Sequence, residues 1–228
     1  PYPGLGSFTE ADAAHFFGRE EEVAALWRRL PRRGMAALIG PSGAGKTSFV
    51  RAGLVANTAT GWRAAVATPG QAPFLAVARA LVGEFAGDVE ATRKLLDLHR
   101  PEVAVELVSR WRERADGVLL VVDQCEELFT LNPPEVPASF ADLLGRLAEL
   151  DGVHVLLSLR DDFLMGCNTH PALRPVFESL TPLSPPSGDH LRRAVVEPAR
   201  LNGFSFEDGH QRRPLAEMVC HLSTRHSV

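Results

Sequence analysis

Hydrophobic positions follow two patterns along this chain. Short apolar runs of strand length occur at residues 35–39, 62–68, 118–122 and 153–159, and residues 177–183 are a candidate for a short last strand. Between these runs, apolar residues recur every three or four positions, which is typical of amphipathic helices. The uninterrupted aliphatic run at 118–122 indicates a strand that is buried on both faces of a parallel sheet. Strands that alternate with helices predict an α/β fold with right-handed crossovers.

The helical pattern and its end signals predict the positions of the helices. Thr9 is a candidate N-cap for a short helical turn, and Ser187 is a candidate N-cap for the last clear helix. Pro133, Pro134 and Pro137 are expected to bound a loop before the helix that starts at Ser139. The predicted helices cover residues 20–30, 46–56, 73–85, 90–98, 102–114, 139–150 and 187–201.

The strand pattern stops after Ser184. We therefore expect a core domain over residues 1–184 and part of a helical lid over 185–228. Pro214 interrupts a helical pattern that begins at Gly209, and residues 222–228 have no periodicity. The sequence leaves the structure of residues 211–228 open.

The first strand run leads into a glycine-rich turn and then into a helical pattern. Residues 40–47 read G-P-S-G-A-G-K-T, which is G-x-x-x-x-G-K-[ST] in the strand-to-helix context of a phosphate-binding loop. Glycines let successive backbone N–H groups point at one anion, and the positive end of the helix adds to that field. Lys46 can then reach the β- and γ-phosphates, and the Thr47 hydroxyl can bind Mg²⁺. The predicted nucleotide contacts in this loop are Gly40, Pro41, Ser42, Gly43, Ala44, Gly45, Lys46, Thr47 and Ser48.

The aliphatic run at 118–122 ends in a carboxylate, Asp123. A buried strand that ends in an acid is the second metal-handling element of a phosphate-loop NTPase. Ligands of open α/β sheets collect at the carboxyl ends of the strands, where Asp123 must lie. We predict that Asp123 holds Mg²⁺ directly or through water; the alternative is a solvated acid at the end of a strand.

Three further charged residues are candidates for catalysis. Glu126 or Glu127 is suited to polarise the attacking water as general base, with Glu126 slightly favoured. The alternative is that both acids only favour the start of a helix. Arg160 follows the strand run at 153–159, where a guanidinium can read the γ-phosphate, unless it pairs with Asp161 or Asp162 instead.

Composition narrows the classes of partner. The net charge of −4 argues against binding of nucleic acid or anionic membrane through bulk electrostatics. The three cysteines form no C-x-x-C pair, and neither a signal peptide nor a run of membrane-spanning length is visible, so we expect reduced thiols and a cytoplasmic location. The initial Pro1 suggests a segment of a longer protein. No H-E-x-x-H, G-x-S-x-G or N-K-x-D motif offers a rival chemistry.

With these residues in place, the chain resembles the STAND class of signal-transduction ATPases, and specifically the bacterial novel STAND NTPase domain, over residues 1–206. One departure is Cys125, where such domains often carry phenylalanine. The motifs that carry the resemblance are P-Y-P-G-L at 1–5, F-F-G-R-E at 16–20, the loop at 40–47, R-A-G-L at 51–54, D-Q-C-E-E-L-F at 123–129, L-R-D-D-F at 159–163 and E-P-A-R at 197–200.

The resemblance implies a three-layer α/β/α P-loop NTPase with a mostly parallel sheet, followed by the start of a small helical lid. Relatives hold ADP in a closed state, exchange it for ATP when a sensor domain is engaged, and then oligomerise to activate an effector. By the resemblance, Phe17, Gly18 and Arg19 lie near the adenine and ribose, and Pro182 lines the base pocket from the lid side. The same resemblance implies that Lys46, Thr47 and Asp123 bind the phosphates and Mg²⁺, and that Arg160 senses the γ-phosphate.

Three functions are therefore considered. The first is an ATP-binding, slowly hydrolysing regulatory switch module with ATP/ADP and Mg²⁺ as cofactors and nucleotide-dependent self-association in the parent protein. The second is a small-molecule or nucleoside kinase, for which Arg192, Arg193 and Arg200 are the candidate lid arginines. The third is a nucleotide-binding scaffold without turnover. None of the three requires direct contact with nucleic acid or membrane.

Overall fold

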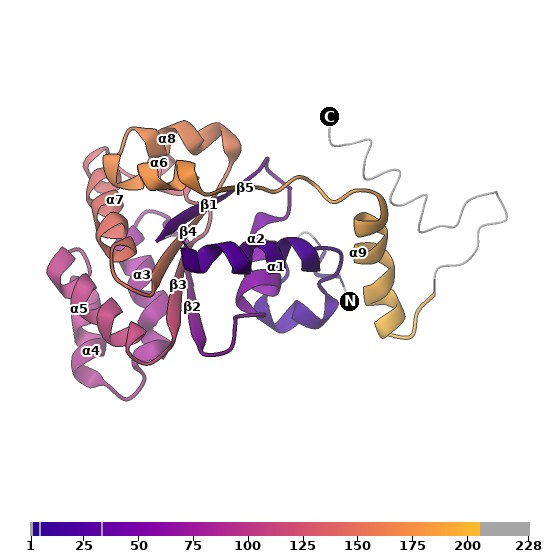
Figure 1. Ribbon diagram of the computed structural model, residues 1–228, viewed down its shortest axis with the longest axis horizontal. Helices are drawn as coiled ribbons and strands as arrows, with labels where there is room; N and C mark the ends of the chain where they lie inside the picture. The colour runs from indigo at the N-terminus through magenta and orange to yellow at the C-terminus, as the bar shows by residue number, and fades with distance from the viewer. Residues whose placement is uncertain (1, 5, 33, 206–228) are drawn as a thin grey trace.

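The computed structural model describes residues 2–4, 6–32 and 34–205, and Figure 1 shows the arrangement. Its centre is a sheet of five strands in the order β2-β3-β4-β1-β5. Every neighbouring pair is parallel, which confirms the predicted α/β class. The strands are β1 (Met35–Ile39), β2 (Trp62–Ala67), β3 (Gly117–Val122), β4 (Val153–Leu159) and β5 (Leu180–Pro182).

The inner strand β3 is aliphatic from Val118 to Val122 because both of its faces are covered. Val118, Leu120 and Val122 pack into the core on one side of the sheet. Leu119 and Val121 pack into the core on the other side, as the alternation of side chains along a strand requires. All six residues of β3 are buried.

Helices occupy both faces of the sheet. The α-helices are α1 (Glu20–Arg29), α2 (Lys46–Ser48), α3 (Pro73–Leu81), α4 (Val89–Lys94), α5 (Pro101–Arg112), α6 (Glu126–Thr130), α7 (Glu135–Ala148), α8 (Leu164–Asn168) and α9 (Gly188–Leu201). Shorter 3₁₀ helices are η1 (Glu10–His15), η2 (Leu30–Arg32), η4 (Val82–Phe85), η5 (Leu95–Asp97), η6 (Asp161–Phe163) and η7 (Pro171–Glu178), and η3 (Phe49–Val55) is a π-helix.

Two hydrophobic layers hold the helices to the sheet. One layer joins the sheet to α1 and η3 through Leu26, Phe49 and Leu54. The other joins the opposite face to α3, α5 and α7, with Trp111 and Phe140 among its fully buried side chains. Figure 1 shows α1 and α2 on one side of the sheet and α3, α5 and α7 on the other. The predicted α/β/α architecture is confirmed.

Several predicted boundaries were wrong. Helix α7 starts at Glu135 rather than Ser139, so Pro137 lies in its first turn instead of bounding a loop. The first N–H groups of a helix have no partner within it, so proline costs little there. The last strand begins at Leu180 rather than at residue 177, because η7 continues to Glu178 and buries Leu173 and Val176.

The predicted helix at 46–56 is α-helical only over α2 and continues as the π-helix η3. Gly53 of η3 packs against the N-terminal segment: an added Cβ would lie 2.9 Å from Phe16 Cε1 and 2.9 Å from Val23 Cγ2. The helices predicted at 73–85 and 90–98 both tighten into 3₁₀ turns, η4 and η5, over their last residues.

Helix α9 follows the sheet and packs against the N-terminal segment. The Tyr2 hydroxyl donates to the carbonyl of Val195, and Arg193 pairs with Glu20 at 2.8 Å. The boundary predicted at residue 185 precedes this helix, and the division into two domains stays a prediction. The predictions for residues 209–228 lie outside the described residues. Within the part of the chain that the structure describes, no helix is long and apolar enough to cross a membrane.

Candidate functional site

The glycine-rich loop joins β1 to α2 at the carboxyl edge of the sheet. Gly43 and Gly45 have φ of 79° and 84°, a left-handed conformation that glycine adopts without steric cost. Gly40 is needed for a different reason: a Cβ there would lie 2.2 Å from the carbonyl oxygen of Leu183. The start of the loop therefore lies directly beside Leu183, the residue that follows β5.

Lys46 lies across the mouth of this loop. Its Nζ donates to the carbonyl of Gly40 at 2.7 Å and to that of Pro41 at 3.0 Å. Burial lowers the pKa of the Lys46 ammonium, while the nearby carboxylates of Glu126 and Asp123 act in the opposite direction. The phosphate-loop lysine and the predicted metal-binding acid are thus close enough to interact electrostatically.

Asp123 is the most unusual group of the site. It is 1% exposed, and neither carboxylate oxygen has a hydrogen-bond partner among the described residues. Its backbone N–H extends the β2–β3 ladder by donating to Ala67 at 2.8 Å, which holds the residue at the strand end. A buried carboxylate without a partner is costly, so this position favours a cation.

The residues present fit Mg²⁺. Thr47 is half-buried, and the structure gives its hydroxyl no partner within the described ranges. Among the described residues, no group of three or more His, Cys, Asp and Glu side chains could hold a metal ion. Mg²⁺ is commonly held by one or two protein oxygens together with water and substrate phosphates, and the Thr47 hydroxyl and the Asp123 carboxylate are oxygen donors of this kind.

The two glutamates after Asp123 point to different places. Glu126 Oε2 accepts from the backbone N–H of Arg160 at 3.3 Å, and Glu126 is the carboxylate with the largest effect on Lys46. Glu127 Oε2 instead accepts from the N–H of Gly70 at 3.1 Å, in the loop between β2 and α3. The structure brings Glu126 to the site and gives Glu127 a role in holding the neighbouring loop.

Arg160 makes the local pair that was considered as its alternative role. Its Nε and Nη2 lie 3.0 Å and 2.6 Å from the two carboxylate oxygens of Asp162. The guanidinium carbon also lies 5.4 Å from the centre of the Phe163 ring. Arg160 is also near enough to Lys46 for its positive charge to contribute to lowering the pKa of that lysine. The Asp162 pair engages Nε and Nη2 of the guanidinium, and the role of Arg160 at a γ-phosphate stays a prediction.

The residues predicted on the adenine side meet the loop from two directions. Arg19 is 8% exposed, and its Nη2 donates to the carbonyls of Ala44 at 3.3 Å and Ser184 at 2.6 Å. The predicted base-pocket residue Pro182 is exposed and pairs in register with Ile39. Arg19 therefore connects the phosphate loop with the chain that leads from β5 to α9.

Gly18 and Phe17 lie at the start of this segment. The carbonyl of Gly18 lies 2.8 Å from Nδ1 of His190 in α9, and Phe17 is half-buried. Ser48, predicted to contact nucleotide, accepts the backbone N–H of Phe8 through its hydroxyl at 3.1 Å. In this structure Ser48 fixes the N-terminal segment to α2.

Ser158 was missed by the sequence analysis. It is fully buried in β4, and its hydroxyl has no partner within the described residues. Val122 pairs with Leu157, so Asp123 and Ser158 are the next neighbours along the two strands. A serine within the otherwise apolar end of the run V-H-V-L-L-S-L was the available signal.

Comparison with known proteins identifies the family. The model of the family described as Novel STAND NTPase 1 matches residues 1–225. The chain belongs to this family. This Novel STAND NTPase 1 chain is therefore a STAND-type P-loop NTPase, and nucleotide binding, usually with Mg²⁺, is what such a core implies. None of the curated proteins compared with the sequence matches it.

Solved structures show the same fold in distant proteins. The Walker-type ATPase PABY2304 of Pyrococcus abyssi is 15% identical with a TM-score of 0.62, over 89% of this chain and 63% of that one. A chain of the E. coli MS115-1 HORMA:CdnC:Trip13 complex is 16% identical with a TM-score of 0.54, over 96% and 78%. CDC6p from Pyrobaculum aerophilum is 19% identical with a TM-score of 0.50, over 80% of this chain and 49% of that one.

Proposed function

We propose that this chain is an ATP-binding, slowly hydrolysing regulatory switch module. The observation that carries the proposal is the buried carboxylate of Asp123, which has no hydrogen-bond partner among the described residues and lies near the Lys46 ammonium of the glycine-rich loop. A triphosphate with its metal satisfies both groups at once, because the ammonium needs an anion and the carboxylate needs a cation.

Each residue then has a defined task. The backbone N–H groups of residues 43–47 bind the phosphates, and Lys46 exchanges the carbonyls of Gly40 and Pro41 for phosphate oxygens. Thr47 and Asp123 would hold Mg²⁺, which neutralises phosphate charge when it is bound. Glu126 accepts the proton of the attacking water, since its carboxylate is the one that faces the site.

The switch is based on Arg19 and α9. Arg19 contacts the loop at Ala44 and the chain before α9 at Ser184, so a change in the loop on nucleotide exchange reaches the helix through one buried side chain. Helix α9 is held to the N-terminal segment through His190 and Arg193. We propose that ADP and ATP favour different positions of α9 and that the parent protein self-associates in its ATP state.

The compartment we propose is the cytoplasm. Cys125 and Cys167 are free and buried, as expected in a reducing environment. The kinase alternative has less support, because Arg193 is paired with Glu20 and Arg200 lies 3.9 Å from Glu197, so two of its three candidate lid arginines already have partners.

Calorimetric titration with ATP, with and without Mg²⁺, tests the proposal. We expect Mg²⁺-dependent binding that Lys46→Ala strongly weakens and that Lys94→Ala, a change at a surface lysine paired with Glu90 and Glu106, leaves intact. Absence of nucleotide binding by the wild type would contradict the proposal. ATP that stays intact over a long incubation would indicate a scaffold, and a phosphorylated acceptor would indicate a kinase.

A further inference from the structure

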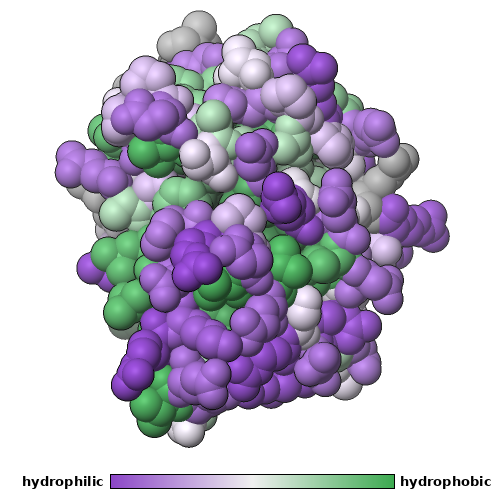
Figure 2. Space-filling view, turned by 90° about the vertical axis from the view of Figure 1, so that its left-hand side faces the viewer, coloured by the Kyte–Doolittle hydropathy of each residue, from purple (hydrophilic) through white to green (hydrophobic). Residues whose placement is uncertain are grey.

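An apolar groove lies on the helices that connect β2 with β3. It runs between α3–η4 on one side and α4–η5 on the other, and it encloses about 500 Å³. Figure 2 shows the face of the molecule that carries α4 and α5, where patches of apolar side chains interrupt the polar surface. Two side chains of the groove, Val89 and Leu96, are 75% and 72% exposed.

The two sides of the groove have the same residue spacing. On one side Leu75, Ala78, Arg79 and Val82 occupy positions i, i+3, i+4 and i+7, and on the other Val89, Thr92, Arg93 and Leu96 do the same. Residues at this spacing share one face of a helix. Each helical segment thus presents a large apolar residue at both ends of its face, a small residue near the middle and an arginine beside it.

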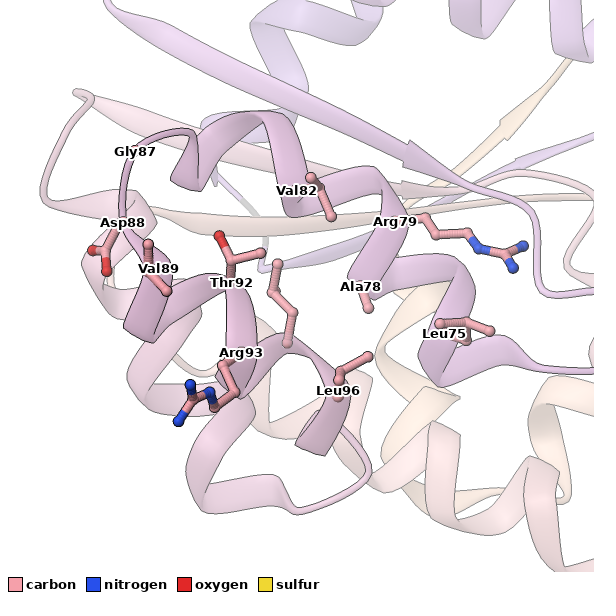
Figure 3. Close-up of a pocket in the computed structure, with 11 residues that line it drawn as sticks. Leu75, Ala78, Arg79, Val82, Gly87, Asp88, Val89, Thr92, Arg93 and Leu96 are labelled. Carbon is pink, nitrogen blue, oxygen red and sulfur yellow. The ribbon is translucent and has the colours of Figure 1, made fainter.

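The described residues of the chain leave these faces exposed. Leu75, Val82, Val89 and Leu96 are the exposed large hydrophobic residues between β2 and β3, and all four line this one groove. In Figure 3, Ala78 and Leu96 face each other across it, while Arg79 and Arg93 reach outward from opposite sides. A continuous apolar surface rimmed by polar groups is typical of an interaction site.

The charge at the rim selects the partner. The guanidinium groups of Arg79 and Arg93 make no hydrogen bond or ion pair with any described residue. The one carboxylate of the lining, Asp88, is already engaged, since it accepts from the N–H of Ala91 at 3.0 Å and pairs with Arg110 at 2.5 Å. The free charge of the rim is positive on a chain whose net charge is −4.

We propose that this groove binds an acidic amphipathic helix of a partner protein. Apolar side chains at i, i+4 and i+7 of that helix would fill the groove, and flanking carboxylates would pair with Arg79 and Arg93. A membrane surface is a poorer match, because two arginines on an acidic chain give little attraction to anionic lipid. The proposal does not depend on nucleotide binding.

A pair of designed peptides tests it by fluorescence anisotropy. One is an amphipathic helix with leucine at i, i+4 and i+7 and glutamate on its flanks, and the other carries lysine in place of every glutamate. We expect the wild-type chain to bind the glutamate peptide at least about tenfold more tightly than the lysine peptide. The double variant R79E/R93E should reverse this preference, and both charge-swapped residues are on the surface.

Two further variants separate apolar from electrostatic contributions. Leu96→Asp should lower the affinity for the glutamate peptide by about tenfold or more, because it places a carboxylate in the apolar groove. Arg28→Glu, at an exposed arginine of α1 on the opposite side of the sheet, should change neither affinity. Far-ultraviolet circular dichroism is the control that tests whether each variant is folded.

The proposal is overturned if neither peptide binds, or if both bind equally well and R79E/R93E has no effect. It is also overturned if light scattering shows that the wild-type chain dimerises and that Leu96→Asp makes it monomeric, because the occupant would then be a second copy. Reversal of peptide preference in R79E/R93E supports it, since loss of folding cannot produce a gain of binding.

Discussion

The ammonium nitrogen of Lys46 lies 2.7 Å from the carbonyl oxygen of Gly40, the residue that follows β1. The same nitrogen is 3.0 Å from the carbonyl of Pro41, so the lysine closes over its own loop. Neutral carbonyls are weaker partners for an ammonium than phosphate oxygens are. The Lys46 ammonium is therefore positioned at the loop, where an anion could replace the two carbonyls as its partner.

Nucleotide affinity should fall as the pH rises through the alkaline range. Burial lowers the pKa of Lys46 in the free protein, and a bound triphosphate raises it again by favouring the ammonium. Between these two pKa values, binding takes up a proton, so affinity is full below the lowered pKa and declines above it. Titration calorimetry in buffers of different ionisation enthalpy measures this uptake.

Lys46→Met supplies the control for the pH dependence. It has no group that titrates at this position, so its residual affinity should not vary with pH in the same range. An equal alkaline decline in wild type and Lys46→Met would assign the effect to another group.

Asp123→Asn should change stability and nucleotide binding in opposite directions. The wild-type carboxylate is buried with no hydrogen-bond partner among the described residues, so removing its charge should raise the free energy of unfolding in the absence of Mg²⁺ by about 1 kcal/mol. The same change should remove most of the Mg²⁺ dependence of ATP binding, because a neutral amide is a poor ligand for this ion.

Urea unfolding in a chelating buffer measures the first effect, and ATP titration with and without Mg²⁺ measures the second. Asp142→Asn, at an exposed aspartate of α7, is the matched control and should alter stability by less than about 0.5 kcal/mol. A less stable Asp123→Asn variant would mean that the carboxylate has a stabilising partner.

Substitutions of Glu126 and Glu127 should have different effects, the first on hydrolysis and the second on stability. Glu126→Gln keeps the size of the side chain but removes the base, so we expect about a hundredfold slower hydrolysis with ATP binding retained. Glu127→Ala should instead leave the N–H of Gly70 without its carboxylate and lower stability by about 1 kcal/mol, with hydrolysis largely unchanged. Phosphate release and thermal unfolding of both variants test this; the reverse pattern would exchange their roles.

The core of the fold was predictable because the buried strands have a distinctive sequence pattern. A strand covered on both faces needs apolar residues at every position, and Val118 to Val122 meet that requirement without interruption. The end of such a strand also located Asp123, since parallel strands place their carboxyl ends on one edge. The glycine-rich loop with Lys46 and Thr47 was recognisable for the same reason: its chemistry is local in sequence.

Contacts between distant segments were not predictable. Nothing in the sequence indicates that the Arg19 guanidinium donates to Ser184, because the two residues are brought together only when β5 pairs with β1. The assignment of Glu127 to Gly70 and of Ser48 to Phe8 has the same origin. The start of α7 was predicted too late because proline breaks the interior of a helix but is acceptable in the first turn, where Pro137 lies.

Gly18→Ala should release α9 from the N-terminal segment. Gly18 has φ of 86°, and an added Cβ would lie 2.3 Å from the carbonyl oxygen of His190, which is too close for any methyl group. Gly87→Ala is a matched control, because Gly87 has φ of 85° but no atom within 4 Å of the added Cβ. Both variants carry the same backbone strain of about 1 kcal/mol, and only Gly18→Ala also forces α9 away.

Limited trypsin digestion distinguishes the two variants. We expect cleavage after Arg192 and Arg193 to accelerate in Gly18→Ala, since Arg193 loses its pairing with Glu20 when α9 moves, and to stay at the wild-type rate in Gly87→Ala. If α9 transmits the nucleotide state, Gly18→Ala should also lose any difference between ADP and ATP in this digestion while still binding both. Equal cleavage of the two variants would mean that the contact between Gly18 and His190 does not hold α9 in place.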